Sequence, residues 1–339
     1  MANRLSAILF TLFALFTACI SKKPVIENFT GLAQGTTYSI VYDNNINISP
    51  LDLKVKVEKI LHDFDMSLSV YQDSSVISRI NRNEAAVPDS FFVDVFNRSV
   101  LISQMTDGAF DITVGPLVRA WGFGPDDHRN FTEEKRDSLL RLVGMDKIDM
   151  VNGRLVKSDP AVTLDVNAIA QGYSVDVVCR YFKSIGLSDY LVEIGGEVMA
   201  VGTKGGAPWR IGIDRPEDNN MIPGQSLQAI IKITDKAVST SGNYRKFYVE
   251  DGIKYSHTID PKTGYPSKNR LLSATIVADN CTMADGIATA CMVMGKEKAI
   301  DFIASHRGLS AYFVFSDDSG NYKTWMSDDL KNKISEKEN

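Results

Sequence analysis

The spacing of apolar residues predicts clusters of strands separated by single helices. Apolar residues recur every three or four positions in the segments predicted as helices, which are 51–64, 91–105, 132–142, 170–185 and 285–305. Short alternating or apolar segments between turn residues are predicted as strands, namely 37–42, 155–157, 162–166, 190–194, 198–202, 209–214, 227–234, 247–258, 272–277, 311–315 and 322–326. Because strands and helices do not alternate regularly, we expect an α+β fold with mixed or antiparallel sheets and packed helices.

Turn residues refine this prediction locally. Asp159-Pro160 predicts a hairpin between 155–157 and 162–166, and Asp251-Gly252 predicts one within 247–258. The hydroxyl residues Ser239-Thr240-Ser241 before Gly242 predict a polar turn. The segment 285–305 contains no proline and is expected to form one long helix.

The first residues are typical of an exported lipoprotein. Arg4 precedes an apolar run over 5–16, which is the length of a signal-peptide core and too short to span a bilayer. Small residues lead to Cys19, which we expect to carry a lipid; the alternative is a plain secretory signal. The predicted organisation is a signal peptide over 1–18, a tether over 19–30 and one catalytic domain over 31–330, anchored at the periplasmic face of the inner membrane.

Charge and cysteine content exclude some classes of protein. Among the 339 residues, 37 basic and 42 acidic side chains give a net charge of −5, so we expect no nucleic-acid partner. An anionic ligand remains compatible with this charge if a metal ion supplies the positive charge locally. Cys179, Cys281 and Cys291 are widely spaced and form no CxxC pair, which disfavours a disulfide framework or a zinc site.

One candidate site lies at the predicted start of the last long helix. Asp285 and Thr289 are four residues apart, so they share a helix face. A carboxylate and a hydroxyl on one face are hard oxygen donors suited to Mg²⁺, and a helix N-terminus also favours a phosphate. The alternative is that Asp285 is an ordinary helix residue and Thr289 has no ligand.

A second candidate segment is 164–173, where a predicted strand turns into a helix. Asp165 stands at the strand end, where a carboxylate can reach a ligand, although a simple connector has the same pattern. Asp107–Leu117 is a turn followed by an apolar element, in which Ala109 and Phe110 are candidates for the wall of a flat ring. The alternative there is a turn and a core element.

A third candidate segment surrounds His257, one of four histidines in the chain. His257 leads into a rigid turn that contains Asp260-Pro261 and closes at Gly264. A histidine in this position is suited to acid–base chemistry or to a phosphate contact. A structural histidine is the alternative.

Taken in order, these segments resemble the ApbE family of FAD:protein FMN transferases. The similar segments are Gln34–Tyr38, Tyr71, Ser78–Asn81, Gly108–Gly115, Asp165–Asp176, Ile194–Gly196, Ser239–Tyr244, His257–Gly264 and Ala284–Gly295. The resemblance implies a T-fold-like catalytic unit that binds FAD, with Mg²⁺ held by the side chains of Asp285 and Thr289 and the backbone at Ala168. It implies FAD contacts at Gln34, Tyr71, Ala109, Phe110, Asp111, Asp165, Gln171 and Ile259. Gln34 stands where the family often has Met, and Gln171 replaces a charged residue.

The implied reaction transfers FMN from FAD to a Thr or Ser hydroxyl of an acceptor protein and releases AMP. His257 is the expected base or phosphate contact, with Asp260 as a weaker candidate, and Asp285 is the expected metal-bound catalytic carboxylate. The alternatives are FAD hydrolysis to FMN and AMP, and a flavin-binding lipoprotein without turnover. Acceptors implied by the resemblance are flavin-bearing subunits of membrane redox pumps of the sodium-translocating NADH:quinone reductase and Rnf type.

Overall fold

A computed structural model describes residues 23–123, 131–217, 220, 224–244, 247–250 and 253–337, with residues 248–250 and 253–254 described by their backbone alone. The predicted signal peptide, Cys19 and the turn at Asp251-Gly252 lie outside the described residues. Within the described residues, no helix combines the length and apolar character needed to cross a membrane.

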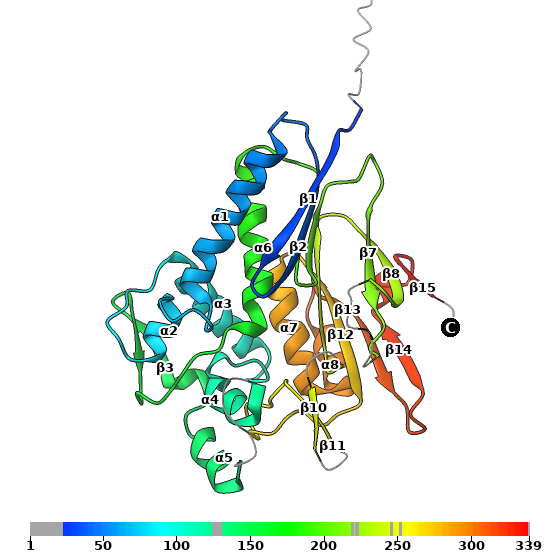
Figure 1. The fold of residues 1–339 in the computed structure, drawn as a ribbon. Helices are drawn as coiled ribbons and strands as arrows, with labels where there is room; N and C mark the ends of the chain where they lie inside the picture. The colour runs from blue at the N-terminus through cyan, green and yellow to red at the C-terminus, as the bar shows by residue number, and fades with distance from the viewer. Residues whose placement is uncertain are drawn as a thin grey trace, which may run out of the picture.

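An eight-stranded antiparallel sheet forms the centre of the molecule (Figure 1), in the order β1-β2-β5-β6-β9-β12-β13-β14. Its strands are β1 (Ile26–Ala33), β2 (Thr36–Asp43), β5 (Tyr190–Ile194), β6 (Glu197–Val201), β9 (Lys236–Gly242), β12 (Leu271–Ala278), β13 (Ser310–Ser316) and β14 (Tyr322–Met326). Smaller antiparallel sheets are formed by β7 (Trp209–Asp214), β8 (Leu227–Ile233) and β15 (Ile334–Glu336), by β3 (Ile148–Val151) and β4 (Arg154–Lys157), and by β10 (Phe247–Glu250) and β11 (Ile253–Ser256).

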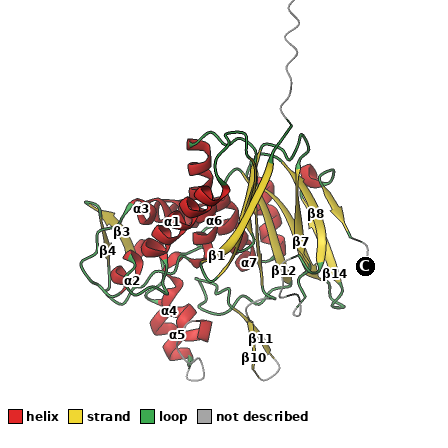
Figure 2. Cartoon of the chain, turned by 45° about the horizontal axis from the view of Figure 1, so that its top comes forward, coloured by secondary structure: helices red, strands yellow, loops and turns green. Residues whose placement is uncertain are grey.

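Helices pack on one face of the central sheet and the three-stranded sheet packs on the other (Figure 2). The helices are α1 (Pro50–Leu68), α2 (Val76–Asn81), α3 (Ser90–Met105), α4 (Gly115–Val118), α5 (Glu133–Leu140), α6 (Asn167–Ser184), α7 (Cys281–Met294) and α8 (Lys296–Ser305). Shorter turns are η1 (Ile112–Val114), η2 (Arg119–Phe123), η4 (Met145–Lys147) and η5 (Asp328–Leu330).

Alternation along the strands builds both layers of the core. In β12, Ala274 and Ile276 belong to the core on the helix side, whereas Val277 packs with the three-stranded sheet. In β13, Phe313 likewise belongs to the core on the helix side, and Val314 packs with the three-stranded sheet. Period-two side-chain direction explains this division, since successive residues of a strand point to opposite faces. The expected α+β class with antiparallel sheets and packed helices is therefore confirmed.

The central sheet has two ends with different roles. At one end, called the site end here, lie the β1–β2 turn at Gln34-Gly35, the β5–β6 turn at Gly195-Gly196 and the last residue of β9, Gly242. At the opposite end, called the entry end, β1 begins at Ile26 and β9 begins at Lys236. The described chain therefore enters the sheet far from the loops of the site end, as Figure 1 shows.

Three local predictions are wrong. Strand β4 pairs with β3 rather than with 162–166. The segment 162–166 is not a strand, and the backbone of its central residue Leu164 is paired with the Asn81 side chain instead. Ser239–Ser241 belongs to strand β9, which lies between β6 and β12, rather than to a polar turn. The long helix over 285–305 is two helices, because Gly295 adopts φ +76° and ends α7.

The predicted boundaries of the catalytic domain are also too narrow. Strand β1 begins at Ile26, inside the segment predicted as a tether, and pairs with β2 along its whole length. At the other end of the chain, β15 pairs with β8 as far as Glu336. Backbone pairing at both ends thus extends the folded unit beyond 31–330.

Candidate functional site

The candidate site is built where α6 crosses α7. Gly172 makes this crossing possible, since a Cβ there would lie 2.4 Å from the Cys281 carbonyl oxygen and 2.7 Å from the Asp285 Cβ. The Gly172 amide donates to Asp285 Oδ2 at 2.9 Å. In a helix the carbonyl of residue i points towards the amide of residue i+4, so the Ala168 carbonyl is directed to the same place. The predicted meeting of Asp285 with the start of α6 is therefore present.

The carboxylate of Asp285 is buried, with 6% of the residue exposed. Burial raises its pKa to about 7, against the hydrogen bond from Gly172, and the nearby Asp176 carboxylate adds to the rise. No Lys, Arg or His of the described chain forms an ion pair with Asp285. A buried carboxylate without a basic partner is costly when ionised, and a bound cation would remove that cost.

Thr289 supplies a hydroxyl one turn further along α7. Its Oγ1 lies 3.1 Å from the Ser241 hydroxyl at the site end of β9. Oxygen donors such as the Asp285 carboxylate, the Thr289 hydroxyl and a backbone carbonyl fit Mg²⁺ better than a soft metal. Among the described residues, no group of three or more His, Cys, Asp or Glu side chains is arranged to hold a metal ion. Any ion here would therefore depend on hydroxyl and backbone oxygens.

The N-terminus of α7 is capped by the protein itself. Asp176 accepts from the amides of Cys281 and Thr282 at 2.9 Å each and from the Thr282 hydroxyl. Asn280 caps the Met283 amide at 2.9 Å. The expectation that this N-terminus offers a phosphate site is wrong, because its amides are occupied and Asp285 lies in the second turn. Reasoning from sequence missed Asp176; its only signal was an acid among buried positions of α6.

Tyr71, Asp165 and Asn167 form a second part of the site, beside the start of α6. Asp165 Oδ1 accepts from the Asn167 amide at 2.9 Å, which helps to start the helix. Burial of its hydroxyl end raises the pKa of Tyr71, the Asp165 carboxylate adds to the rise, and a hydrogen bond with Asn167 opposes it. The Tyr71 residue is nevertheless 72% exposed, so a ring face is open to a ligand.

Gln34 and Gln171 both lie at the site end of the sheet. Gln34 occupies the β1–β2 turn with φ +53°, and its Oε1 accepts from the Ser174 hydroxyl at 3.3 Å. The Gln171 Nε2 lies against Gly195, where a Cβ would be 2.4 Å away. Gln34 Nε2 is buried and has no hydrogen-bond partner in the described chain. An orphaned buried donor at this position fits a site whose ligand accepts hydrogen bonds.

The segment 109–111 is more structural than expected. Phe110 is 2% exposed and belongs to the core, where its ring lies beside Gly286 of α7. Asp111 accepts from the Thr113 amide at 2.7 Å and hydroxyl at 2.6 Å, and burial raises its pKa. The burial of Phe110 leaves little of its ring exposed to a ligand, whereas Ala109 is only partly buried.

His257 and Ile259 belong to the loop that directly follows β11, a strand in the lower part of Figure 1. Ile259 packs in a small core with Leu117 and Trp121, and Trp121 Nε1 donates to the Gly264 carbonyl at 2.7 Å. The ring of His257 stands edge-on to Phe123, with centroids 6.2 Å apart. The loop is thus held by α4 and η2, whereas Asp285 is held by α6 and α7.

A separate cavity of about 590 Å³ lies at the entry end of the sheet. Its lining includes Lys232, Lys236, Lys333, Ile233 and Val277. None of the predicted site residues contributes to this lining. We therefore place the candidate site at the α6–α7 crossing, where the Gly172 amide meets the Asp285 carboxylate, and not in this cavity.

The fold and site define an α+β protein with a buried carboxylate and a neighbouring hydroxyl at a helix crossing, beside the end of an antiparallel sheet. The family model described as "ApbE family" matches residues 34–313, and the chain belongs to this family. An FAD:protein FMN transferase of Vibrio cholerae is 35% identical over 318 residues, which cover 91% of this chain and 93% of that protein. The corresponding protein of Haemophilus influenzae is 33% identical, with 94% and 95% covered.

Solved structures agree with this assignment. The structure described as "Flavin Transferase ApbE from Vibrio cholerae" has a TM-score of 0.81 at 34% identity and covers 91% of this chain and all of that one. The apo form of the Pseudomonas stutzeri flavinyl transferase ApbE has a TM-score of 0.81 at 34% identity, with 92% and 98% covered. The family resemblance inferred from the motifs is confirmed.

Proposed function

We propose that this chain transfers the FMN moiety of FAD to a Thr or Ser hydroxyl of an acceptor protein, in a reaction that depends on Mg²⁺. The family and its FMN-transferase relatives support the reaction class. The observation that carries the metal dependence is the buried Asp285 carboxylate beside Thr289 and the start of α6, without a basic partner in the described chain.

The proposed step forms one bond and breaks one. The acceptor hydroxyl oxygen bonds to the phosphorus of the FMN half, and the bond from that phosphorus to the bridging oxygen breaks. AMP leaves with the bridging oxygen, and the hydroxyl proton passes to His257. When bound to Asp285, Thr289 and the Ala168 carbonyl, Mg²⁺ would neutralise diphosphate charge.

The remaining predicted residues bind and orient FAD in this proposal. Tyr71 offers an exposed ring, and Gln34 offers a buried unpaired amide. Asp165 lies two residues before α6, and Gln171 lies in the second turn of that helix. The backbone of Ala109–Asp111 and Ile259 would complete the contacts.

We also propose that the protein is exported and held at the membrane by a lipid on Cys19, near flavin-bearing subunits of membrane redox pumps. The apolar run over 5–16 and the small residues before Cys19 support export and lipidation. The described chain enters at the end of the sheet opposite the site, so an anchor there would leave the site accessible. Labelling with a lipid precursor, and its loss in Cys19→Ala, tests this part.

Mass spectrometry of an acceptor peptide after incubation with FAD and Mg²⁺ tests the reaction. We expect a mass gain equal to esterified FMN and an equal amount of AMP. Steady AMP release without an acceptor would instead establish FAD hydrolysis. FAD binding with neither product would establish a flavin-binding protein without turnover.

A further inference from the structure

The segment 162–166 leads into the site without belonging to any sheet. Leu164 in its middle is only 1% exposed, so its backbone amide and carbonyl need partners inside the protein. Asn81 supplies both: Asn81 Oδ1 accepts from the Leu164 amide at 2.8 Å, and Asn81 Nδ2 donates to the Leu164 carbonyl at 2.9 Å. The side-chain amide of Asn81 therefore makes the two hydrogen bonds that a neighbouring strand would otherwise make, although Asn81 and Leu164 are 83 positions apart in the sequence.

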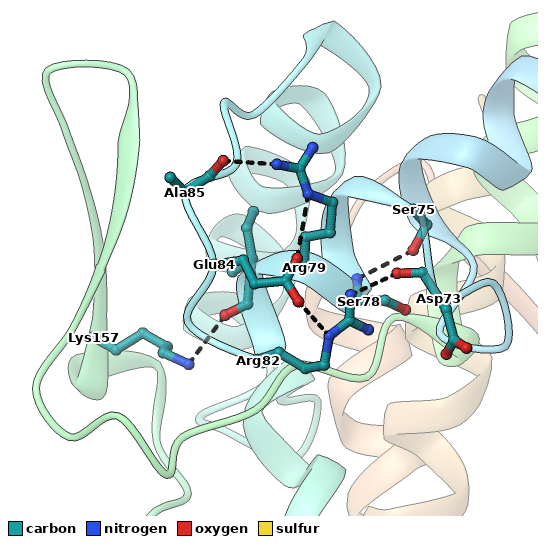
Figure 3. Close-up of polar contacts among 9 residues, drawn as sticks. Asp73, Ser75, Ser78, Arg79, Arg82, Glu84, Ala85 and Lys157 are labelled. Carbon is teal, nitrogen blue, oxygen red and sulfur yellow. Dashed lines mark hydrogen bonds and ion pairs between the residues drawn. The ribbon is translucent and has the colours of Figure 1, made fainter.

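Asn81 is itself held in a rigid position, because it is the last residue of the short helix α2. Ser75 caps this helix by accepting from the Ser78 amide at 3.1 Å. Arg82, directly after Asn81, donates to the Asp73 carbonyl at 2.7 Å, and Figure 3 shows this network around α2. Lys157 of β4 donates to the Ile80 carbonyl at 3.2 Å. The amide of Asn81 is thus fixed from both ends of its helix.

Two parts of the candidate site depend on this arrangement. Directly after Leu164, the Asp165 amide donates to the Ile112 carbonyl at 2.7 Å, and the Asp165 carboxylate starts α6 at Asn167. Ala168 is the next residue of that helix. On the Asn81 side of the Asn81–Leu164 hydrogen bonds, the loop before α2 carries Tyr71, which hydrogen-bonds Asn167. Asn81 therefore links the loop of Tyr71 to the segment that carries Asp165 and Ala168.

We propose that Asn81 is a positioning residue for FAD and Mg²⁺, acting through the backbone of Leu164 on Asp165 and Ala168. This inference rests on the proposed function, because it assigns FAD and Mg²⁺ to these residues. A Mg²⁺ site with one carboxylate, one hydroxyl and one backbone carbonyl tolerates little displacement of its donors, since Mg²⁺ demands near-octahedral geometry. Loss of the Asn81–Leu164 hydrogen bonds would therefore weaken ligand binding and also lower the stability of the fold.

Asn81→Ala tests the proposal against the matched variant Asn83→Ala. Asn83, two residues after α2, donates from its Nδ2 to the carbonyl of Pro160, four residues before Leu164, at 3.0 Å. Both variants lose a side-chain hydrogen bond between neighbouring parts of the same two chain regions, but only Asn81 contacts Leu164. The measurements are the Kd of FAD with and without Mg²⁺, the Mg²⁺ concentration at half-saturation, the melting temperature, and hydrogen exchange of the Leu164 amide.

For Asn81→Ala we expect faster hydrogen exchange of the Leu164 amide. We also expect the Kd of FAD and the half-saturating Mg²⁺ concentration to rise about tenfold, because a tenfold change corresponds to the free energy of about one hydrogen bond. For Asn83→Ala we expect a lower melting temperature with both affinities unchanged. Equal affinities in the two variants, with only their melting temperatures lowered, would mean that Asn81 is merely structural and would overturn the proposal.

A second substitution covers the case in which Asn81→Ala does not fold. Asn81→Asp keeps the acceptor for the Leu164 amide and places a carboxylate against the Leu164 carbonyl. Its affinities should shift in the same direction, and unchanged affinities would overturn the proposal. Wild-type protein that binds neither FAD nor Mg²⁺ would instead refute the proposed function, so the two failures are distinguishable.

Discussion

Neutralising Asp285 should stabilise the metal-free protein at neutral pH while abolishing the effect of Mg²⁺. Asp285→Asn keeps the shape of the side chain. It also keeps an oxygen that can accept from the Gly172 amide, which in the wild-type protein lies 2.9 Å from Asp285 Oδ2. It removes the charge that burial makes costly. The substitution therefore separates the cost of the carboxylate from its proposed role as a ligand.

The magnitude follows from the pKa of Asp285, which burial raises from 3.8 to about 7. A difference of about three units corresponds to about 4 kcal/mol, at about 1.36 kcal/mol per unit. The folded state binds this proton more tightly than the unfolded state, so the free energy of unfolding falls as pH rises from about 4 to about 7. Below pH 4 both states are protonated and the cost disappears.

Urea unfolding in the presence of a chelator at pH 4 and pH 8 measures this effect. The variant should gain about 4 kcal/mol over wild type between the two pH values. Asp301→Asn, at an exposed position on α8, is the control and should show no such gain. Mg²⁺ should then raise the melting temperature of wild type at pH 8 and leave Asp285→Asn unchanged.

A difference between Asp285→Asn and wild type that stays constant from pH 4 to pH 8 would refute the electrostatic argument. Full transferase activity of the variant would refute the metal site. The two results are independent, because the first concerns the metal-free protein alone. Each can therefore be judged without the other.

The other predictions concern helix packing, capping and chemistry. Gly172→Ala should lower both the melting temperature and the FAD affinity, since the new Cβ would lie 2.4 Å from the Cys281 carbonyl oxygen. The control Gly153→Ala, where the new Cβ would meet open space, should affect stability alone. Asp176→Ala should cost about 3–5 kcal/mol in urea unfolding, because it leaves two buried amides of α7 without an acceptor; a loss below 1 kcal/mol contradicts the capping role. His257→Ala should slow FMN transfer by about 10²–10⁴-fold with the Kd of FAD unchanged, and weaker FAD binding would make it a ligand contact instead.

Local sequence signals were sufficient for most of the longer helices and for most strands, but not for the short helices α2 and α4 or for the break between α7 and α8. The amphipathic spacing over 170–185 predicted α6, and the ordered motifs predicted the family. Both signals are carried by neighbouring residues and need no knowledge of distant partners. The i, i+4 spacing of Asp285 and Thr289 likewise survives in α7, because it depends on helix geometry alone.

Residues far apart in sequence decided what those signals could not. The segment 162–166 has the composition of a strand, but its partner is the side chain of Asn81. Ser239–Ser241 lacks an apolar pattern and becomes a strand because β6 and β12 flank it. Asp285 receives the Gly172 amide across 113 residues, and its raised pKa comes from burial at that crossing. Burial and long-range hydrogen bonding are properties of the packed chain, so no local pattern can encode them.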